Sequence, residues 1–396
     1  MESISSKNGA TPPRREGTPT PGKLWGFRVL LIAPWLPLLL PLVAFSVRLA
    51  EVREGAGEGQ FETLVSYLQA KHLSWEVEGL TRGPAARRIY FLGASSLVLP
   101  NPTLTFPAIV QTLLDHPTSR IVCHNLARSG IDSYSIKSIL SRALELHKPD
   151  LVVLYAGHND YNIPYRTLLK PRYHLIRGTR AEQLLETLGA DSWFFSRLKV
   201  GFGSGLGWFL ESNLEPLLLK YLQRSGLLRI DDALFARCDA AILAAYVANL
   251  EAILGLTREA HLPLVVVVPV CNLETEPVGT PEHTTQPYFQ GLAETDQAAR
   301  LSLLRRARDG DRFGGDLRAK TPLLEHLRGL ASTEGVVVFD LERALEKRGA
   351  RFDYGEFYDA FHLLPQTHRL VAELLEPVLR ELLASPRRAT PPVPLP

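Results

Sequence analysis

The chain has 396 residues, which is longer than a typical domain but fits one α/β core that carries insertions. It contains 44 Lys and Arg against 42 Asp and Glu, so its formal net charge of +2 provides no overall field that would concentrate nucleic acid or acidic substrates. Cys123, Cys238 and Cys271 have no C-x-x-C spacing, which indicates neither a zinc site nor a disulfide framework and leaves one optional bridge open. We therefore expect no metal, no cofactor and no nucleic-acid partner.

The N-terminal region begins with a polar tail and continues into an uncharged apolar segment. Residues 1–23 are rich in Pro, Gly, Ser and Thr, which is typical of a disordered tail. Residues 29–46 carry no charge and are long enough to cross a hydrocarbon core of roughly 30 Å, so we predict a transmembrane signal anchor over residues 24–49. A cleaved signal peptide is the alternative, but no clear small-x-small cleavage site follows the segment.

The charges on either side of this segment predict its orientation. The basic residues that precede it are Lys7, Arg14, Arg15, Lys23 and Arg28. The charged residues that follow it are Arg48 and Arg53 among Glu51, Glu54 and Glu58. The positive-inside rule then predicts a cytoplasmic tail, a single membrane pass and export of everything after about residue 47.

Beyond the membrane segment, we expect a connector over residues 50–86 and a folded domain over residues 87–384. Helical spacing of apolar residues predicts a helix at 61–72 in the connector. Five short runs of Val, Ile and Leu then predict strands, at Arg88–Leu92, Ile121–Asn125, Leu151–Tyr155, Leu264–Val270 and Val336–Asp340. These runs lack strict alternation, as is typical of parallel strands that are covered on both faces.

Longer helical patterns lie between and after these strands. They occur at Phe106–Leu114, Ser133–Leu146, Ala240–Ala260, Thr321–Ala331 and His368–Leu383. Such helices can supply the crossovers between parallel strands. The sequence therefore predicts an α/β fold, a three-layer α/β/α sandwich with a five-stranded, mainly parallel sheet.

Two segments do not fit this alternation. Residues 161–235 are too long for one connection, and we interpret them as a helical insertion. Their Gly-rich stretch at 201–207 has neither the preceding strand nor the spacing of a dinucleotide loop, which favours a flexible hinge. Residues 385–396 are predicted to be a Pro-rich tail.

Four short motifs stand at the predicted strand ends and near the last helix. They are Gly93–Ser96, Asn125–Gly130, Gly157–Asp160 and Asp359–His362. The first three follow predicted strands, and the carboxyl ends of parallel strands are where open α/β sheets bind ligands. The fourth follows the fifth strand and precedes the last helix.

Three of the motifs can supply a nucleophile and an oxyanion hole. Ser95 lies where the first strand should turn into a helix, a position that can expose a side-chain oxygen. Gly130 can bring its backbone N–H close to a ligand, and Asn159 can point its amide at a developing oxyanion. Taken singly, Ser95 is typical of a helix N-cap, Gly130 of a turn, and Asn159 of a turn or cap; Ser96 can take the capping role in place of Ser95.

The fourth motif can supply the base. Asp359 and His362 are three residues apart, so the carboxylate can hold one imidazole nitrogen while the other faces Ser95. An isolated D-x-x-H pattern is usually a surface pair or a cap. The four motifs together contain the parts that acyl-transfer chemistry on a serine needs.

This set of residues resembles the SGNH hydrolases, also called the GDSL-like lipase and acylhydrolase family, over Arg87 to about Leu383. The longer phrases Pro149–Asn159 and Phe357–Asp359 resemble a membrane-anchored bacterial branch of that family. The resemblance implies a flavodoxin-like fold and a catalytic triad of Ser95, Asp359 and His362. It also implies an oxyanion hole made of the Ser95 N–H, the Gly130 N–H and the Asn159 side chain.

The chain departs from the family pattern at two positions. Ala94 replaces the Asp of the first motif, which leaves the nucleophile unchanged because that Asp is not the triad acid. His368 stands where a Gly is common, so we expect the start of the last helix to differ.

These expectations lead to one function and two alternatives. The resemblance implies an esterase of the cell envelope, anchored in the inner membrane with its domain in the periplasm, that acts on an acylated small molecule, glycan or lipid. In one alternative, the same triad transfers acetyl groups to an exported polysaccharide, with water excluded from the acyl-enzyme by the long insertion. In the other, the domain is a noncatalytic binding module, although such a module has no chemical need for all four motifs.

Overall fold

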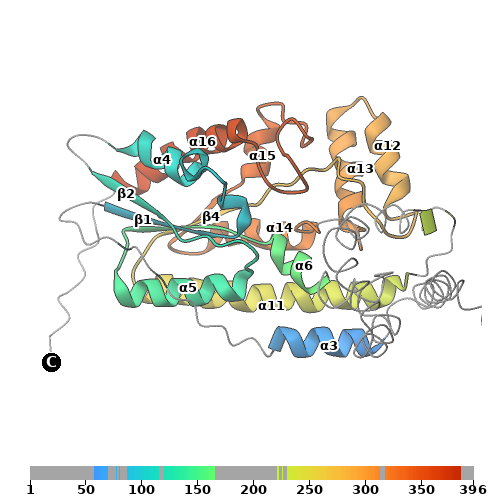
Figure 1. The fold of residues 1–396 in the computed structure, drawn as a ribbon, viewed down its shortest axis with the longest axis horizontal. Coiled ribbons are helices and arrows are strands. Elements are labelled where there is room, and N and C mark those ends of the chain that lie inside the picture. The colour runs from blue at the N-terminus through green and yellow to red at the C-terminus, as the bar shows by residue number, and fades with distance from the viewer. Residues whose placement is uncertain are drawn as a thin grey trace, which may run out of the picture.

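The computed structural model describes residues 58–69, 77, 80, 87–115, 120–165, 221–222, 225, 230–312 and 317–384. The predicted tails at 1–23 and 385–396, the predicted anchor at 24–49 and most of the predicted insertion lie outside these residues. The described part forms one sheet with helices on both of its faces (Figure 1).

The sheet has five parallel strands in the order β2-β1-β3-β4-β5. The strands are β1 (Arg87–Gly93), β2 (Ile121–Asn125), β3 (Leu151–Tyr155), β4 (Leu264–Val267) and β5 (Val336–Phe339). Two strands, β2 and β3, have the predicted bounds, whereas β4 ends three residues before the predicted Val270. The predicted five-stranded parallel sheet is confirmed.

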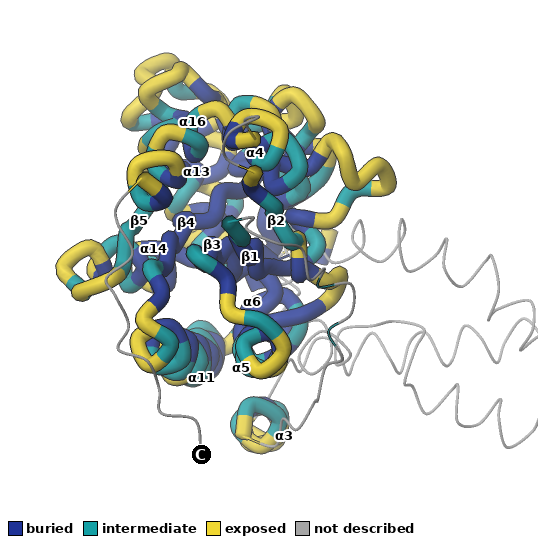
Figure 2. The backbone as a smooth tube through the Cα atoms, turned by 90° about the vertical axis from the view of Figure 1, so that its left-hand side faces the viewer, coloured by how far each residue is buried: buried dark blue, intermediate teal, exposed yellow. Residues whose placement is uncertain are grey.

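Side chains alternate between two hydrophobic clusters, one on each face of the sheet. In β1, Tyr90 and Leu92 belong to one cluster and Ile89 and Phe91 to the other. The first cluster includes side chains from α5 (Ser133–Leu146), α11 (Asp232–Glu259) and α14 (Thr321–Gly329). The second includes side chains from α4 (Phe106–Leu114), α12 (Thr285–Ala293), α13 (Gln297–Asp309), α15 (Leu341–Glu346) and α16 (Pro365–Ala384). The strands are therefore buried between two helical layers, as Figure 2 shows, and the predicted three-layer sandwich is confirmed.

The helices agree with the sequence patterns to different extents. Both α4 and α5 have the predicted bounds, whereas α11 begins eight residues before the predicted Ala240. The side chain of Asp231 explains this earlier start, because it caps α11 by accepting a hydrogen bond from the Leu234 N–H. Both α12 and α13 were not predicted from the sequence. In the connector, α3 (Glu58–Gln69) begins three residues before the predicted helix and lies outside α11, where Glu58 forms an ion pair with Arg237 (2.7 Å).

One helix in the described part of the chain, α11, is long and apolar enough to cross a membrane by length and composition. Its buried residues recur at helical spacing, at Leu234, Cys238, Ile242, Tyr246 and Leu250, and they belong to the hydrophobic cluster on one face of the sheet. The apolar residues of α11 therefore pack in the protein core. The predicted membrane segment at residues 29–46 lies outside the described residues.

Candidate active site

The predicted site residues stand at the carboxyl edge of the sheet. Ser95 follows β1, Gly130 follows β2, and Asn159 follows β3. Because β1 lies between β2 and β3, the chain changes direction across the sheet here, and such switch points are where open α/β sheets bind ligands. The loop that carries Asp359 and His362 is joined to this edge by a hydrogen bond of 2.9 Å from the Asn272 N–H, in the segment after β4, to the Ala360 carbonyl.

Ser95 begins a short 3₁₀ turn, η1 (Ser95–Leu97), directly after β1. Ala94 occupies the N-cap position, and no side chain caps the turn, so neither Ser95 nor Ser96 has the capping role considered from the sequence. The expected helix is also reduced to this single turn. Ser96 is buried, whereas Ser95 is partly exposed. Of the two hydroxyls, that of Ser95 is the one that a substrate can reach.

Asn125 connects the second motif to the serine turn. Its amide Nδ2 donates to the Leu97 carbonyl at the end of η1 (2.8 Å), and its Oδ1 accepts from the Ala127 N–H (3.2 Å). The backbone of the same loop adds a hydrogen bond from the Arg128 N–H to the Gly93 carbonyl (3.3 Å). These contacts hold the loop that leads to Gly130 beside the turn that carries Ser95.

Asn159 is joined to the loop of Gly130 through the next residue of that loop, Ile131. Gly130 has φ +72°, a left-handed conformation that favours glycine, and it is exposed. Asn159 is buried in the first turn of α6 (His158–Pro164), and its Nδ2 donates to the carbonyl of Ile131 (2.8 Å). A side-chain amide has two N–H groups, so this contact orients the amide and leaves one N–H for a ligand.

Gly157 occupies the position before α6 and so places Asn159 in the first turn of this helix. It precedes α6 with φ +137°, a backbone conformation that side chains other than glycine rarely adopt. Asn159 does not occupy the N-cap position of α6, because Gly157 does. The turn or cap role considered from the sequence is therefore not the one that the structure gives to Asn159.

Asp359 and His362 form the closest polar contact of the predicted site. The imidazole Nδ1 lies 2.5 Å from Asp359 Oδ2, while Asp359 Oδ1 accepts from the backbone N–H groups of Phe361 (3.0 Å) and His362 (2.8 Å). Burial alone would raise the pKa of Asp359, but the hydrogen bonds from His362 and from the two backbone N–H groups outweigh burial and lower it. The carboxylate is therefore ionised at neutral pH and can orient the imidazole.

Aromatic rings surround His362. Tyr358 stacks on it, with ring centroids 5.4 Å apart and an interplanar angle of 10°, and Phe361 lies at 4.7 Å in a tilted arrangement. Phe361 in turn stacks on His158 of the third motif at 5.0 Å and 10°. The third and fourth motifs are thus in direct contact, although about 200 residues separate them in the chain.

The structure joins some of the predicted site residues and not others. It brings Asp359 and His362 together, and it connects the loops of Ser95, Gly130 and Asn159 through backbone carbonyls. Among the described residues it records no hydrogen bond between the Ser95 hydroxyl and the His362 imidazole. Such contacts are often long in the absence of substrate, so the roles of the individual residues stay predictions.

His368 lies near the start of the last helix, where we expected a difference from the family pattern. The helix α16 begins at Pro365, three residues before the predicted start, which places His368 inside its first turns. The imidazole is fully buried, and its Nδ1 accepts a hydrogen bond from the Phe106 N–H at the start of α4 (3.3 Å). Burial, together with the nearby His362, lowers the pKa of His368 to about 4. Here His368 joins two helices.

Sequence reasoning missed two residues that shape the site. Asn125 and His158 both lie inside the motifs, but neither was assigned a role. The position of Asn125 directly at the end of a predicted strand was the available signal for it. No local pattern indicated the contacts of His158. In the part of the chain that the structure describes, no group of three or more His, Cys, Asp or Glu is arranged to hold a metal ion.

No family model matches the chain, and no curated protein matches it. An acetylxylan esterase from Geobacillus stearothermophilus is similar in structure, with 14% identity and a TM-score of 0.37 over 75% of this chain and 95% of that one. A lipase/acylhydrolase from Enterococcus faecalis has 13% identity and a TM-score of 0.34 over 74% and 96%. A member of the lipolytic protein G-D-S-L family from Veillonella parvula DSM 2008 has 10% identity and a TM-score of 0.35 over 74% and 98%.

At this identity and these TM-scores, the similarity establishes neither an activity nor a substrate. Both are therefore inferred from the residues of the site.

Proposed function

We propose that the chain is a serine esterase or acylhydrolase that cleaves an O-acyl ester, such as an acetyl ester, through an acyl-enzyme on Ser95. The observation that carries this proposal is the Asp359–His362 pair, in which an ionised carboxylate holds one imidazole nitrogen at 2.5 Å. A histidine held in this way has its other nitrogen available as a general base. The partly exposed Ser95 at the end of β1 is the matching nucleophile.

The proposed reaction assigns one step to each group. His362 Nε2 accepts the Ser95 proton as the hydroxyl oxygen attacks the acyl carbonyl, and the N–H groups of Ser95 and Gly130 with the Asn159 amide stabilise the oxyanion. The alcohol leaves with the proton from His362, and an ester remains on Ser95. A water molecule then gives a proton to His362 and attacks this ester, which releases the carboxylic acid and restores the hydroxyl.

The acceptor of the acyl group separates hydrolysis from acyl transfer. In the alternative function, a hydroxyl of an exported polysaccharide takes the place of water in the second half of the reaction. We would incubate the full-length protein with p-nitrophenyl acetate, with and without an acceptor glycan, and follow acetate release and acceptor mass. Acetate release that is independent of the glycan supports the esterase. A mass gain of the glycan supports the transferase, and the absence of any p-nitrophenol release above that of the Ser95→Ala protein supports a noncatalytic module.

Asn159→Ala is expected to lower kcat on the order of 100-fold and to change KM little, because the amide interacts mainly with the charge that develops in the transition state. Melting temperature and kcat should be measured on the same preparation. The contact with Ile131 is also lost in this variant, so some destabilisation is expected in either case. A destabilised variant with unchanged kcat per folded molecule would remove Asn159 from the oxyanion hole.

We further propose that the enzyme is anchored in the inner membrane, with its catalytic domain in the periplasm. The uncharged segment at residues 29–46 and the basic residues before it support this location. External protease should digest the domain only after the outer membrane has been permeabilised, and the mature protein should keep its N-terminal residues. A mature chain that begins near residue 50, or a domain digested only from the cytoplasmic side, would contradict this topology.

A further inference from the structure

We propose that His158 is a positioning residue for the catalytic pair: its imidazole is held at both ring nitrogens and stacks on Phe361, which fixes the loop of Asp359 and His362. The expected effect of His158 on catalysis rests on the proposed esterase function. The geometric part, that His158 orders the base, can be tested without any turnover.

Two backbone groups hold the imidazole of His158. The Ala319 N–H donates to Nδ1 (3.0 Å), so the proton of the neutral ring must lie on Nε2, which donates to the Val270 carbonyl (3.0 Å). Burial lowers the pKa of His158 to about 3, and the nearby His362, Arg308 and Arg318 act in the same direction. The ring is therefore neutral at working pH and has a single tautomer.

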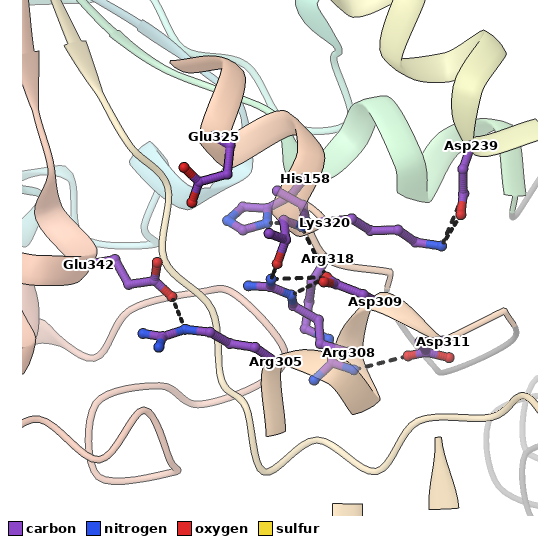
Figure 3. Close-up of polar contacts among 12 residues, drawn as sticks. His158, Asp239, Arg305, Arg308, Asp309, Asp311, Arg318, Lys320, Glu325 and Glu342 are labelled. Atoms are coloured by element: carbon purple, nitrogen blue, oxygen red, sulfur yellow. Dashed lines mark hydrogen bonds and ion pairs between the residues drawn. The ribbon is translucent and has the colours of Figure 1, made fainter. Parts of the chain in front are cut away.

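The residues on both sides of Ala319, the residue that donates to His158, form ion pairs (Figure 3): the Arg318 pair is buried, and in the Lys320 pair the lysine is buried while Asp239 is partly exposed. Arg318 pairs with Asp311 at 3.0 Å, and both side chains are at most 1% exposed. Lys320 pairs with Asp239 of α11 at 2.8 Å. Removing one partner of a buried pair is strongly destabilising, so these contacts give Ala319 a fixed position.

The next residue in the chain extends the same restraint. Thr321 accepts a hydrogen bond from Arg308 at its hydroxyl (2.7 Å) and donates its backbone N–H to Asp309 (3.0 Å). Every residue from Arg318 to Thr321 therefore makes a hydrogen bond or an ion pair with another element. His158 receives its hydrogen bond from a rigid part of the protein.

On its other side, His158 contacts the catalytic loop through a ring. The imidazole lies nearly parallel to the Phe361 ring, at 5.0 Å and 10°. The backbone N–H of Phe361 donates to Asp359 Oδ1, and its ring also contacts His362. A shift of Phe361 would therefore disturb the carboxylate and the imidazole together. Catalysis is sensitive to such shifts, since a displacement of about 1 Å can cost about 100-fold in rate.

Two variants separate the ring of His158 from its hydrogen bonds. His158→Phe keeps a flat ring against Phe361 and loses both hydrogen bonds, whereas His158→Gln keeps a donor for the Val270 carbonyl and loses the ring. We expect kcat with p-nitrophenyl acetate to fall about 10-fold in His158→Gln at unchanged KM, because no ring then supports Phe361. In His158→Phe the fall should be smaller, about 3-fold, because a ring stays against Phe361 but the two backbone groups no longer hold it. His158→Phe should nevertheless have the lower melting temperature, because it leaves two buried backbone groups unpaired.

Ile253→Ala provides a control for stability alone. Ile253 is buried in α11, which ends at Glu259 shortly before β4 begins, so this residue lies toward the amino edge of the sheet. The substitution removes core packing and should lower the melting temperature without changing kcat per folded molecule. If the His158 variants, like the control, lose melting temperature but keep their kcat per folded molecule, the proposed positioning role is wrong.

A double-mutant cycle tests whether His158 acts through Phe361. In a Phe361→Leu protein, His158→Gln should cause no further fall in kcat, because the ring contact is already lost. If the two substitutions lower kcat independently, so that the fold-losses of the single variants multiply in the double variant, His158 does not act through Phe361 and the proposal is contradicted.

The tautomer of His362 gives a readout that does not require activity. In full-length protein labelled with ¹⁵N-histidine, NMR should find His362 protonated on Nδ1, facing Asp359, and His158 protonated on Nε2. His158→Gln should move His362 toward a mixture of tautomers, and His158→Phe should do so to a smaller extent. An unchanged His362 in both variants overturns the positioning role. Esterase activity that survives in Ser95→Ala overturns the proposed function instead, and leaves the NMR result valid.

Discussion

Ser95→Ala is expected to abolish ester cleavage and labelling by a fluorophosphonate probe, with a loss in kcat on the order of 10⁴-fold or more. The reason is chemical, because alanine has no oxygen that can form the acyl-enzyme. The fold should survive, since Ser95 lies on a short turn and does not cap it. Turnover of p-nitrophenyl acetate, probe labelling and melting temperature should be measured on the same preparation.

Ser96→Ala is the matched control for this variant. Ser96 is the next residue of the same turn and also has a hydroxyl, but it is buried. We expect labelling and turnover to be retained in Ser96→Ala. Labelling that persists in Ser95→Ala and disappears in Ser96→Ala would move the nucleophile by one residue.

Asp359→Asn is expected to lower kcat on the order of 10⁴-fold while the loop stays folded. The asparagine amide would present an N–H to His362 Nδ1, whereas the carboxylate of Asp359 accepts a hydrogen bond from the Nδ1–H. This favours the tautomer with the proton on Nε2, which cannot take the proton of Ser95. Steady-state kinetics near pH 7 measure the loss.

Asp353→Asn is the matched control in the same loop. Asp353 also accepts a backbone hydrogen bond, from the Gly355 N–H at 2.7 Å, but it does not contact His362. We expect this change to alter kcat less than about 2-fold, because the Asp359 carboxylate that contacts His362 is unchanged. Equal losses in the two variants would show that Asp359 has only a structural role.

The pH dependence of the Asp359 contact follows from the direction of its pKa shift. The pKa of the folded carboxyl is lowered from the ordinary value of 3.8, so the contact contributes stability that is fully present above that value. The contribution is lost as the pH falls through the lowered pKa. Comparisons near pH 7 are therefore made with the carboxylate ionised, and a change in kcat there reports the orientation of His362.

The amino-acid sequence by itself determined the strands, the layers and the positions of the four motifs. Strands such as β3 are continuous runs of buried apolar residues, and this pattern is local, so β2, β3, α4 and α5 have the predicted bounds. The motifs could be found because parallel strands bring their carboxyl ends to one edge of the sheet. The spacing of Asp359 and His362 likewise determined their contact, since three residues of chain suffice to make it.

Only the tertiary structure decided which parts of the chain hold these motifs in place. His158 receives its hydrogen bond from Ala319, 161 positions further along the chain, and stacks on Phe361, while Asn159 contacts Ile131 and Asn125 contacts Leu97. Such contacts depend on the strand order and on the course of the segments after β4 and α13. The local spacing of apolar residues predicts neither of these. The ion pairs around Ala319 were unpredictable for the same reason, because charged residues are usually exposed and only the fold shows that Arg318, Asp311 and Lys320 are buried and paired.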